Sequence, residues 1–220
     1  MLTVHHLDNS RSQRILWLLE ELQLPYEVRA YKRGSDRLAP PELKSVHPLG
    51  RAPVLTEGAT TLAETGAIVD YILETHARGR LMPVQDSPDY WTCRHFLHYA
   101  EGSAMPPLFL GLVLSVIAER TPALVRPVIR TAMDKANEAF VAPQTQAHVD
   151  YWEASLKTTG WFAGPAFSVA DVMMSFPIEA ASARLNFSAR PLLRDFLARI
   201  HARPAYRAAL ERGGPYAYAS

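Results

Sequence analysis

Cysteine is almost absent from this sequence, and charge of either sign is balanced. Cys93 is the single cysteine of the 220 residues, which excludes an internal disulfide and any metal site built from several thiolates. The eight histidines are scattered, and the adjacent pair His5 and His6 falls in an expected strand, where neighbouring side chains point to opposite faces. We therefore expect no metal. The net charge of +1 gives no electrostatic argument for a nucleic acid or an anionic membrane as partner.

Long apolar runs are also missing. The N-terminus is polar and lacks a signal-peptide core. No run approaches the roughly 18 apolar residues of a membrane helix, because the longest candidate, Met105 to Ala118, is interrupted by Pro106, Pro107 and Gly111. Hydrophobic residues make up 48% of the chain, enough for a normal core. These features predict a soluble, intracellular globular protein of one large or two small domains.

The first third of the chain alternates strand and helix patterns. The predicted elements are a strand at Leu2–Leu7, a helix at Arg11–Leu22, an extended segment from Pro25 to Val28, a short helix at Pro41–Ser45, a hairpin of Pro53–Thr56 with Thr60–Leu62, and a helix at Glu64–Thr75. Asp8, Asn9 and Ser10 form a turn and N-cap cluster between the first strand and helix. The order is βαβ followed by ββα, which predicts an α/β domain over residues 1–78.

No convincing strand follows residue 76. A helix capped by Ser87 or Asp89 is expected to reach Ala118, with a bend near Pro106 and Pro107. The remaining helices are predicted at Pro122–Lys157 with a break near Pro143, Ser168–Ala183, Arg190–His201 and Pro204–Gly213. Ser168 and Asp171 have the spacing of a reciprocal N-cap. Residues 87–220 are therefore expected to form an all-helical domain.

The stretch from Val46 to Glu64 carries the strongest indication of a ligand. Pro53 has no N–H for a sheet ladder, so a strand that starts there leaves the backbone of Ala52 available to a ligand. Glu64 and Thr65 open a helix, whose free N–H groups attract a carboxylate. This pattern predicts a small, peptide-like, anionic ligand.

Four sequence patches carry a resemblance to a known family. They are Asn9–Ser10 to Leu19, Pro48 to Leu55, Ala63 to Ile68, and Phe167 to Asp171. In this order and spacing the chain resembles the cytosolic glutathione transferases over nearly its whole length. The resemblance implies a thioredoxin-like N-terminal domain and a helical C-terminal domain. It also implies glutathione as co-substrate, a homodimer, a cytoplasmic location and a role in detoxification.

The resemblance also implies roles for individual residues. Pro53 is expected to be cis and to let Ala52, followed by Val54, bind the cysteinyl part of glutathione through the backbone. Glu64 and Thr65 match the pair that receives the γ-glutamyl amine and carboxylate, with Thr65 in place of the more usual serine. The remaining glutathione positions are Arg11, Arg51 near the glycyl carboxylate, and His47, where asparagine is frequent.

The resemblance leaves two candidates for activating the thiol. A free thiol has a pKa of roughly 8.5, and a donor aimed at the sulfur favours the thiolate. Ser10 is the first candidate, as in serine-type bacterial and fungal members, since no tyrosine precedes Tyr26. Asn9 is the second, through its side-chain amide, and Arg11 can add positive charge. No cysteine lies in this loop, which argues against disulfide exchange through an enzyme thiol.

The electrophile pocket is expected between the domains, lined by Tyr99, Met105 and Phe109. Glu101 is read either as a solvated or capping carboxylate or, in a dimer, as a group that reaches the partner's glutathione. The predicted function is a glutathione transferase that directs the thiolate at a hydrophobic electrophile. The alternatives are glutathione-dependent peroxide or disulfide reduction, isomerisation, or a non-catalytic binding protein with the same fold.

Overall fold

A four-stranded mixed sheet forms the N-terminal part of the computed structural model, which describes residues 1–36 and 38–219. The strands are β1 (Leu2–Leu7), β2 (Tyr26–Tyr31), β3 (Val54–Glu57) and β4 (Thr60–Ala63), in the order β2-β1-β3-β4. β1 runs parallel to β2 and antiparallel to β3, and β3 and β4 form a hairpin. The predicted βαβ and ββα units and the thioredoxin-like fold are confirmed.

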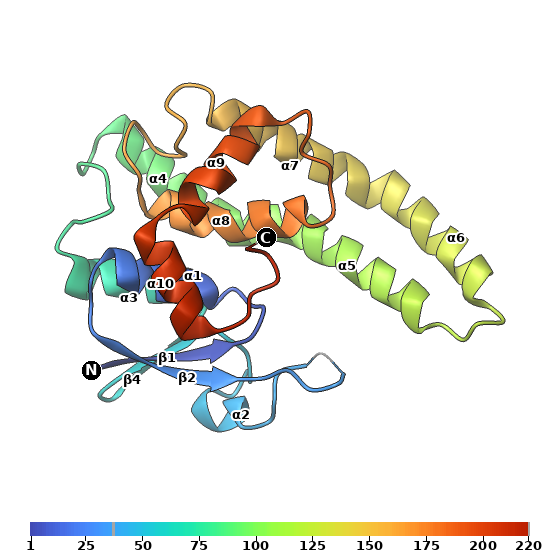
Figure 1. Cartoon of the computed structure of the whole chain (residues 1–220), viewed down its shortest axis with the longest axis horizontal. Coiled ribbons are helices and arrows are strands. Elements are labelled where there is room, and N and C mark those ends of the chain that lie inside the picture. The colour runs from blue at the N-terminus through green and yellow to red at the C-terminus, as the bar shows by residue number, and fades with distance from the viewer. Residues whose placement is uncertain (37, 220) are drawn as a thin grey trace.

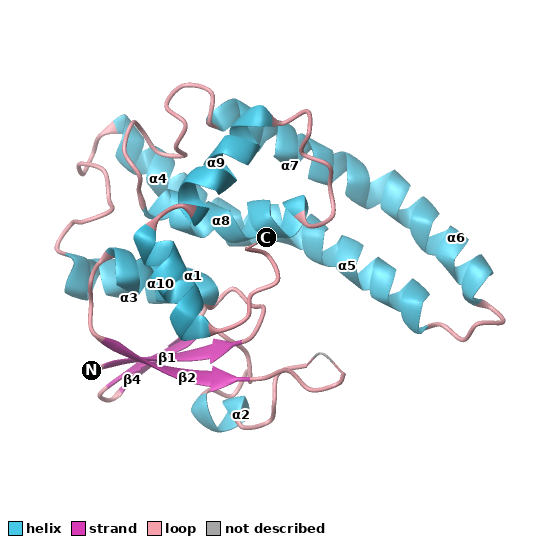
Figure 2. Cartoon of the chain, in the orientation of Figure 1, coloured by secondary structure: helices cyan, strands magenta, loops and turns pink. Residues whose placement is uncertain are grey.

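Helices cover both faces of this sheet (Figure 2). α1 (Gln13–Glu21) and α3 (Thr65–Ile72) lie on the face toward the helical region, while α2 (Leu43–Val46) lies on the opposite side (Figure 1). α3 continues into a wide π-helical turn, η1 (Leu73–Ala77). The apolar stripe expected on α1 is buried throughout, with Ile15, Leu16, Leu18, Leu19 and Leu22 each at most 1% exposed. This stripe attaches α1 to both the sheet and the helical core.

The start of α1 differs from the prediction. The helix begins at Gln13 rather than Arg11, and Ser12, not the cluster at residues 8–10, occupies the N-cap position. The reason is local. Asn9 adopts a left-handed backbone conformation with φ of 48°, and the hydroxyls of Ser10 and Ser12 bind each other instead of capping the helix. The turn between β1 and α1 is therefore longer than expected.

Residues 88–213 are helical in the order that the sequence predicts, with no strand among the described residues. The elements are α4 (Pro88–Tyr99), η2 (Ala100–Ala104), α5 (Met105–Arg120), α6 (Arg126–Ala136), η3 (Asn137–Val141), α7 (Ala142–Ser155), α8 (Val169–Ser182), α9 (Pro191–His201) and α10 (Pro204–Gly213). Ser87 caps α4 by accepting the N–H of Tyr90, as predicted. The predicted start of a helix at Pro122 is wrong. α6 begins at Arg126, where Pro127 fits the first helical turn because its missing N–H is not needed there.

α4, η2 and α5 form one long helix, and α5 and α6 extend beyond the body of the molecule (Figure 1). The segment Pro88–Arg120 is long and apolar enough to cross a membrane, by length and composition only. The sequence prediction considers only Met105–Ala118 of this segment and treats Pro106, Pro107 and Gly111 as interruptions. Pro106 and Pro107 do not break the helix, since they lie in the first turn of α5 directly after the wide turn η2.

Asp171 joins the first turn of α8 to the preceding loop. Its Oδ2 accepts the backbone N–H and the hydroxyl of Ser168, at 2.8 and 3.2 Å, and its Oδ1 accepts the N–H of Phe162 at 2.9 Å. The predicted reciprocal N-cap is thereby confirmed. Asp171 is fully buried, and this burial raises the pKa of its carboxyl to about 6.

We expect Asp171→Ala to lower the free energy of unfolding by about 2–4 kcal/mol, because two buried N–H groups lose their acceptor. Ser168→Ala removes only a hydroxyl and should cost about 1 kcal/mol. Urea titration followed by circular dichroism measures both effects. The exposed Ser188→Ala serves as control and should stay within about 0.5 kcal/mol of wild type. Equal losses for all three variants would contradict the assignment.

Candidate active site

Strand register brings the three predicted binding segments to one edge of the sheet. His5 of β1 pairs with Val54 of β3, and Val54 pairs with Ala63 of β4. The turn that follows β1 therefore lies beside the residues before β3. In the same way, the residues that follow β4 lie beside the start of β3. The turn at residues 8–12, Ala52–Pro53 and Glu64–Thr65 share this edge although they are far apart in the sequence.

Ala52 and Pro53 lead into β3 through a cis peptide bond, as the resemblance implied. The ladder of β3 begins at Val54, so the backbone N–H and C=O of Ala52 stay outside the sheet. Pro53 and Val54 are buried, which places the proline ring inward and the backbone of Ala52 at the surface of the site. This arrangement suits an extended peptide-like ligand that lies antiparallel to the segment.

Glu64 occupies an unusual backbone conformation at the start of α3. Its φ of 72° is positive, which is uncommon for a residue with a side chain and is concentrated at functional sites. Its carbonyl accepts the N–H of Ile68 and so starts the helix. Thr65, the first helical residue, is 3% exposed. The positive end of α3 thus lies next to a carboxylate, and the pair can receive both charges of an amino acid head group.

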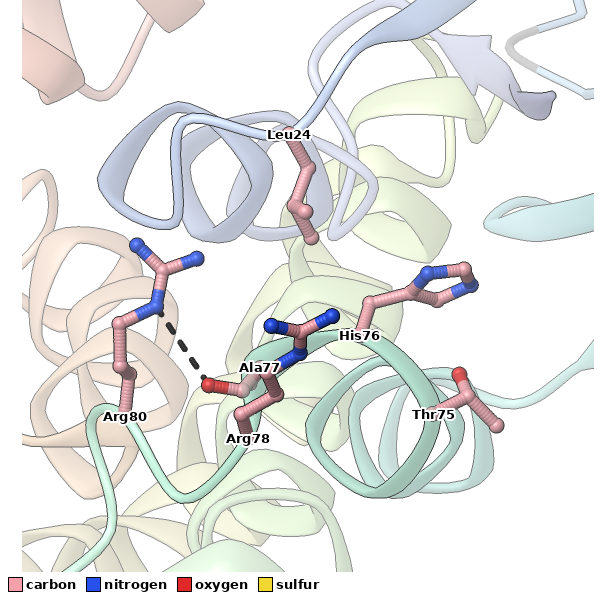
Figure 3. A pocket seen from close by; sticks show the side chains of 6 residues that line it. All are labelled: Leu24, Thr75, His76, Ala77, Arg78 and Arg80. Carbon is pink, nitrogen blue, oxygen red and sulfur yellow. Dashed lines mark hydrogen bonds between the residues drawn. The ribbon is translucent and has the colours of Figure 1, made fainter.

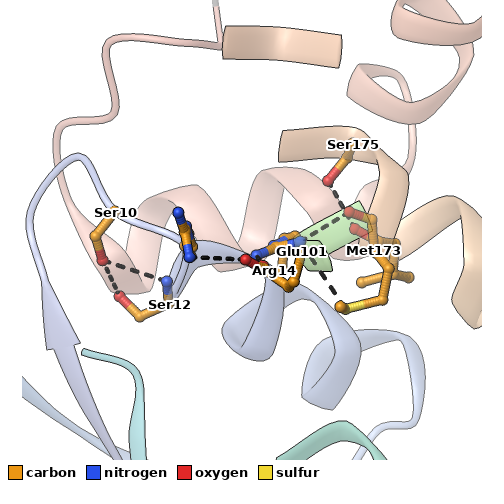
Figure 4. Close-up of polar contacts among 8 residues, drawn as sticks. Ser10, Ser12, Arg14, Glu101, Met173 and Ser175 are labelled. Carbon is orange, nitrogen blue, oxygen red and sulfur yellow. Dashed lines mark hydrogen bonds and ion pairs between the residues drawn. The ribbon is translucent and has the colours of Figure 1, made fainter. Parts of the chain in front are cut away.

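The hydroxyl of Ser10 faces inward rather than toward open solvent (Figure 4). Its Oγ lies 2.7 Å from the Oγ of Ser12 and accepts the N–H of Ser12 at 3.2 Å. The Oγ of Ser12 in turn lies 2.8 Å from Nδ1 of His6, a buried side chain of β1. Ser10 is therefore the outer member of a buried chain of three polar side chains.

Proton positions in this chain follow from the surroundings of His6. Burial lowers the pKa of His6, so the ring is neutral at pH 7 and has one N–H. Nε2 of His6 lies close to Gly213, whose backbone favours a proton on the ring, so we infer that Nε2 carries the proton and Nδ1 accepts the proton of Ser12. Ser12 then accepts from Ser10. In this arrangement the hydroxyl of Ser10 donates its single proton to the Oγ of Ser12.

Gly213 reaches His6 because α10 ends close against α1. A Cβ at position 213 would lie 2.6 Å from Oε1 of Gln13, 2.9 Å from Cδ1 of Leu16 and 3.3 Å from Nε2 of His6. A larger residue at this position would require the ends of the buried Gln13 and Leu16 side chains to move. The last helix of the helical region therefore supports the floor of the site.

A buried ion pair lies directly beyond the turn (Figure 4). Arg14 of α1 is 1% exposed, and its guanidinium binds Glu101 of η2 and the carbonyl of Met173 in α8, the latter at 2.8 Å. Arg11 adds a second ion pair to Glu101 at 2.7 Å. Burial by itself raises the pKa of Glu101, but the charges of Arg14 and Arg11 outweigh it and lower the pKa overall. Glu101 is thus an ionised partner of two arginines of its own chain, rather than a solvated or capping carboxylate.

Asn9 is held from two sides. Arg33 donates to the carbonyl of Asn9 at 3.4 Å and to the carbonyl of Asp8 at 3.2 Å. On the side-chain end, Oδ1 of Asn9 accepts the backbone N–H of Ala217 at 2.7 Å. The segment that follows α10 thus reaches the turn. Sequence reasoning missed this segment, because its small and aromatic residues carry no periodic pattern.

Comparison with known proteins decides the family. Residues 1–74 match the family model for the N-terminal domain of glutathione S-transferase, and residues 116–204 match that for its C-terminal domain. Glutathione S-transferase 1 of Saccharomyces cerevisiae is 34% identical over 96% of this chain and 95% of its own length. The chain belongs to the glutathione S-transferase family.

Solved transferase structures agree with this assignment. A glutathione S-transferase from Actinobacillus pleuropneumoniae is 29% identical and superposes with a TM-score of 0.80 over 99% of this chain and 95% of that one. A sphingomonad glutathione S-transferase solved in complex with glutathione is 25% identical, with a TM-score of 0.72 over 96% of this chain and 98% of that one.

The three residues predicted for the electrophile pocket of the transferase have different surroundings. Tyr99 turns toward α7, where its hydroxyl lies 2.5 Å from Nδ1 of His148 and accepts Nε1–H of Trp152 at 3.0 Å. Met105 is buried in the core, whereas Phe109 is 57% exposed on α5. Tyr99 is therefore a member of the aromatic core between α4 and α7. Phe109 stays available to a ligand.

The predicted glycyl end of the site is open. Arg51 is exposed and half-buried His47 follows α2, where its Nδ1 accepts the N–H of Leu49 at 3.4 Å. Neither side chain has an ion pair among the described residues. Both remain available to a carboxylate of the ligand.

Two cavities lie away from this edge. One, of about 480 Å³, is lined by Leu24, Thr75, His76, Ala77, Arg78 and Arg80, at the end of α1 opposite the turn (Figure 3). Arg80 there is bound to the carbonyls of Ala77 and Leu22. The other, of about 390 Å³, lies between α5 and the α6–α7 segment. Neither includes the residues of the predicted glutathione site.

We expect Glu101→Gln to lower the free energy of unfolding by about 3 kcal/mol, because it leaves the buried charge of Arg14 without its carboxylate. Chemical denaturation at neutral pH measures the loss. Glu211→Gln, an exposed residue of α10, removes the same charge and should change stability by less than about 0.5 kcal/mol. If the two variants are equally stable, the ion pair does not hold the turn to the helical region.

Proposed function

We propose that this transferase binds glutathione along the edge formed by the turn after β1, Ala52–Pro53 and Glu64–Thr65, and activates its thiol as a thiolate. The observation that carries the proposal is the convergence of these three segments through the register of β1, β3 and β4. Each segment supplies a different chemistry. The first offers donors for a sulfur anion, the second offers free backbone groups, and the third offers a carboxylate beside a helix N-terminus.

The fit to glutathione follows from its charges. The γ-glutamyl ammonium meets the carboxylate of Glu64, and its carboxylate meets the N–H groups at Thr65. The cysteinyl backbone pairs with Ala52, and the glycyl carboxylate extends toward Arg51 and His47. With both ends held, the sulfur lies at the turn after β1.

At this turn Ser10 and Asn9 compete for the sulfur. The proton of the Ser10 hydroxyl is committed to Ser12, so Ser10 must break a buried hydrogen bond before it can donate to a thiolate. The amide nitrogen of Asn9 has no hydrogen-bond partner among residues 1–36 and 38–219, and it brings two N–H donors. Asn9 is therefore the donor that we propose. Arg11, although paired with Glu101, adds positive charge nearby.

The thiolate then attacks a hydrophobic electrophile held against α5, where Phe109 is exposed. Rate enhancement comes from the lowered thiol pKa and from proximity of the two reactants. We further propose a cytoplasmic homodimer that needs no metal and serves detoxification. Light scattering after gel filtration tests the dimer.

Glutathione conjugation to an aromatic halide tests the activity, with peroxide and mixed-disulfide reduction measured in parallel. We expect conjugation to exceed the other two reactions. Peroxide or disulfide reduction without conjugation would assign another reaction to the same site. Failure to bind glutathione in calorimetry would leave a non-catalytic protein.

We expect Glu64→Ala to weaken glutathione binding about tenfold or more, since a charge-assisted hydrogen bond to the ligand is lost. Isothermal titration calorimetry gives the dissociation constant directly. The matched control is Glu74→Ala, an exposed residue of the turn after α3 that should bind as wild type does. An unaltered affinity in Glu64→Ala would remove Glu64 from the site.

We expect Asn9→Ala to raise the pKa of the bound glutathione thiol by about one unit, with affinity changed by less than about threefold. Ser10→Ala should raise that pKa less, because the hydroxyl of Ser10 is bound to Ser12. Thiolate absorbance of the saturated complex, followed against pH, measures both shifts. The reverse ranking would assign the thiol to Ser10.

A further inference from the structure

The segment after α10 is fixed in place by a buried carboxylate. Glu179 of α8 is 1% exposed, and its Oε2 accepts the hydroxyl of Tyr216 at 2.7 Å. Its Oε1 accepts the hydroxyl of Tyr206 at 2.6 Å and lies 3.0 Å from Nε2 of His201. Burial raises the pKa of Tyr216 well above its usual value, so the phenol keeps its proton and donates it. The segment is thereby attached to the helical core one residue before Ala217.

The far side of Ala217 is also held. The ring of Tyr218 packs against Phe176 of α8, with 5.5 Å between the ring centroids, and against Tyr216, with 5.4 Å between the ring centroids. These contacts on either side of Ala217 fix the orientation of its backbone N–H. It points at Oδ1 of Asn9, with 2.7 Å between the two atoms.

This contact determines the orientation of the Asn9 amide. The two ends of an amide are nearly the same size, and a free asparagine side chain can present either one. A backbone N–H only donates, so the atom that faces Ala217 must be the carbonyl oxygen. The amide nitrogen is then turned away from the segment, with both of its donors unused. Because Arg33 binds the backbone carbonyl of Asn9, only the orientation of the side-chain amide is left to be fixed.

From this geometry we propose that Ala217 is a positioning residue for thiol activation. Its N–H holds the carbonyl end of the Asn9 amide so that the nitrogen end is presented to the glutathione thiolate. The segment of Pro215 to Ala219 is then part of the catalytic machinery through one backbone hydrogen bond. This inference rests on the proposed function and extends it to the helical region.

Ala217→Pro tests the proposal directly, since proline removes the N–H and leaves the rest of the segment in place. The readout is the pKa of the bound glutathione thiol, from thiolate absorbance against pH. We expect a rise of about half a unit to one unit, with the dissociation constant of glutathione within about twofold of wild type. Ala217→Ser is the conservative variant for comparison: Ala217 is exposed and serine keeps the backbone N–H, so the thiol pKa should stay lowered as in the wild type.

Two further variants show whether the effect passes through Asn9. In an Asn9→Ala background, Ala217→Pro should add nothing to the thiol pKa. Asn9→Asp keeps an oxygen for Ala217 but has no N–H for the sulfur, so it should raise the thiol pKa more than Ala217→Pro does. Additive effects of the two substitutions would overturn the proposal.

Other outcomes distinguish a failure of the proposed function from a failure of the role of Ala217. A wild-type thiol pKa equal to that of free glutathione would defeat the proposed function itself. A lowered wild-type pKa that Ala217→Pro leaves unchanged would defeat only the role of Ala217. Tighter glutathione binding in Ala217→Pro, with the same thiol pKa, would make the segment a cover over the site and would likewise overturn this proposal.

Discussion

The guanidinium of Arg14 is the interaction on which the relation between the two halves of the molecule depends. It projects from α1 of the thioredoxin-like region and meets Glu101 of η2, the carbonyl of Met173 in α8 and, at 5.3 Å, the ring of Phe176. A buried charge is costly unless it is paired, so these partners have to stay together. The same helix begins just after the turn that carries the candidate catalytic residues. The contact between the two regions and the position of the turn therefore depend on the same side chain, Arg14.

The sheet supplies the residues that we propose to bind glutathione, whereas the turn that carries the proposed thiol donor also contacts the helical region. Ala52, Glu64 and Thr65 are placed by β3, β4 and α3 alone. The turn after β1, in contrast, is held by Arg33 from the sheet side and by Glu101, Gly213 and Ala217 from the helical side. Under the proposed function, glutathione affinity and thiol acidity are therefore set by different parts of the fold.

Much of this architecture could be predicted from local sequence. Four features are properties of neighbouring residues: the helical stripe of α1, the hairpin after Pro53, the caps at Ser87 and Ser168, and the lack of strands in the described residues 77–219. The inward turn of Ser10 could not be predicted, because the buried position of its neighbours Ser12 and His6 depends on Gly213, which is distant in the chain. The same holds for Tyr99, whose helix face was ambiguous until α7 was placed. Side-chain surroundings that form across long sequence separations could therefore not be predicted, whereas the helix starts expected at Arg11 and Pro122 were wrong for local reasons.

The close approach of α10 to α1 at Gly213 limits how such transferases can be recombined. A chimera that replaces the first 78 residues of this chain by those of a relative cuts the chain between η1 and α4. It nevertheless separates His6 and Gln13 from the glycine that fits against them, and Arg14 from its carboxylate. In such a hybrid, α10 and η2 would have to be taken from the same parent as the sheet. The two segments that the family models match are therefore not the units that can be exchanged without loss of these contacts.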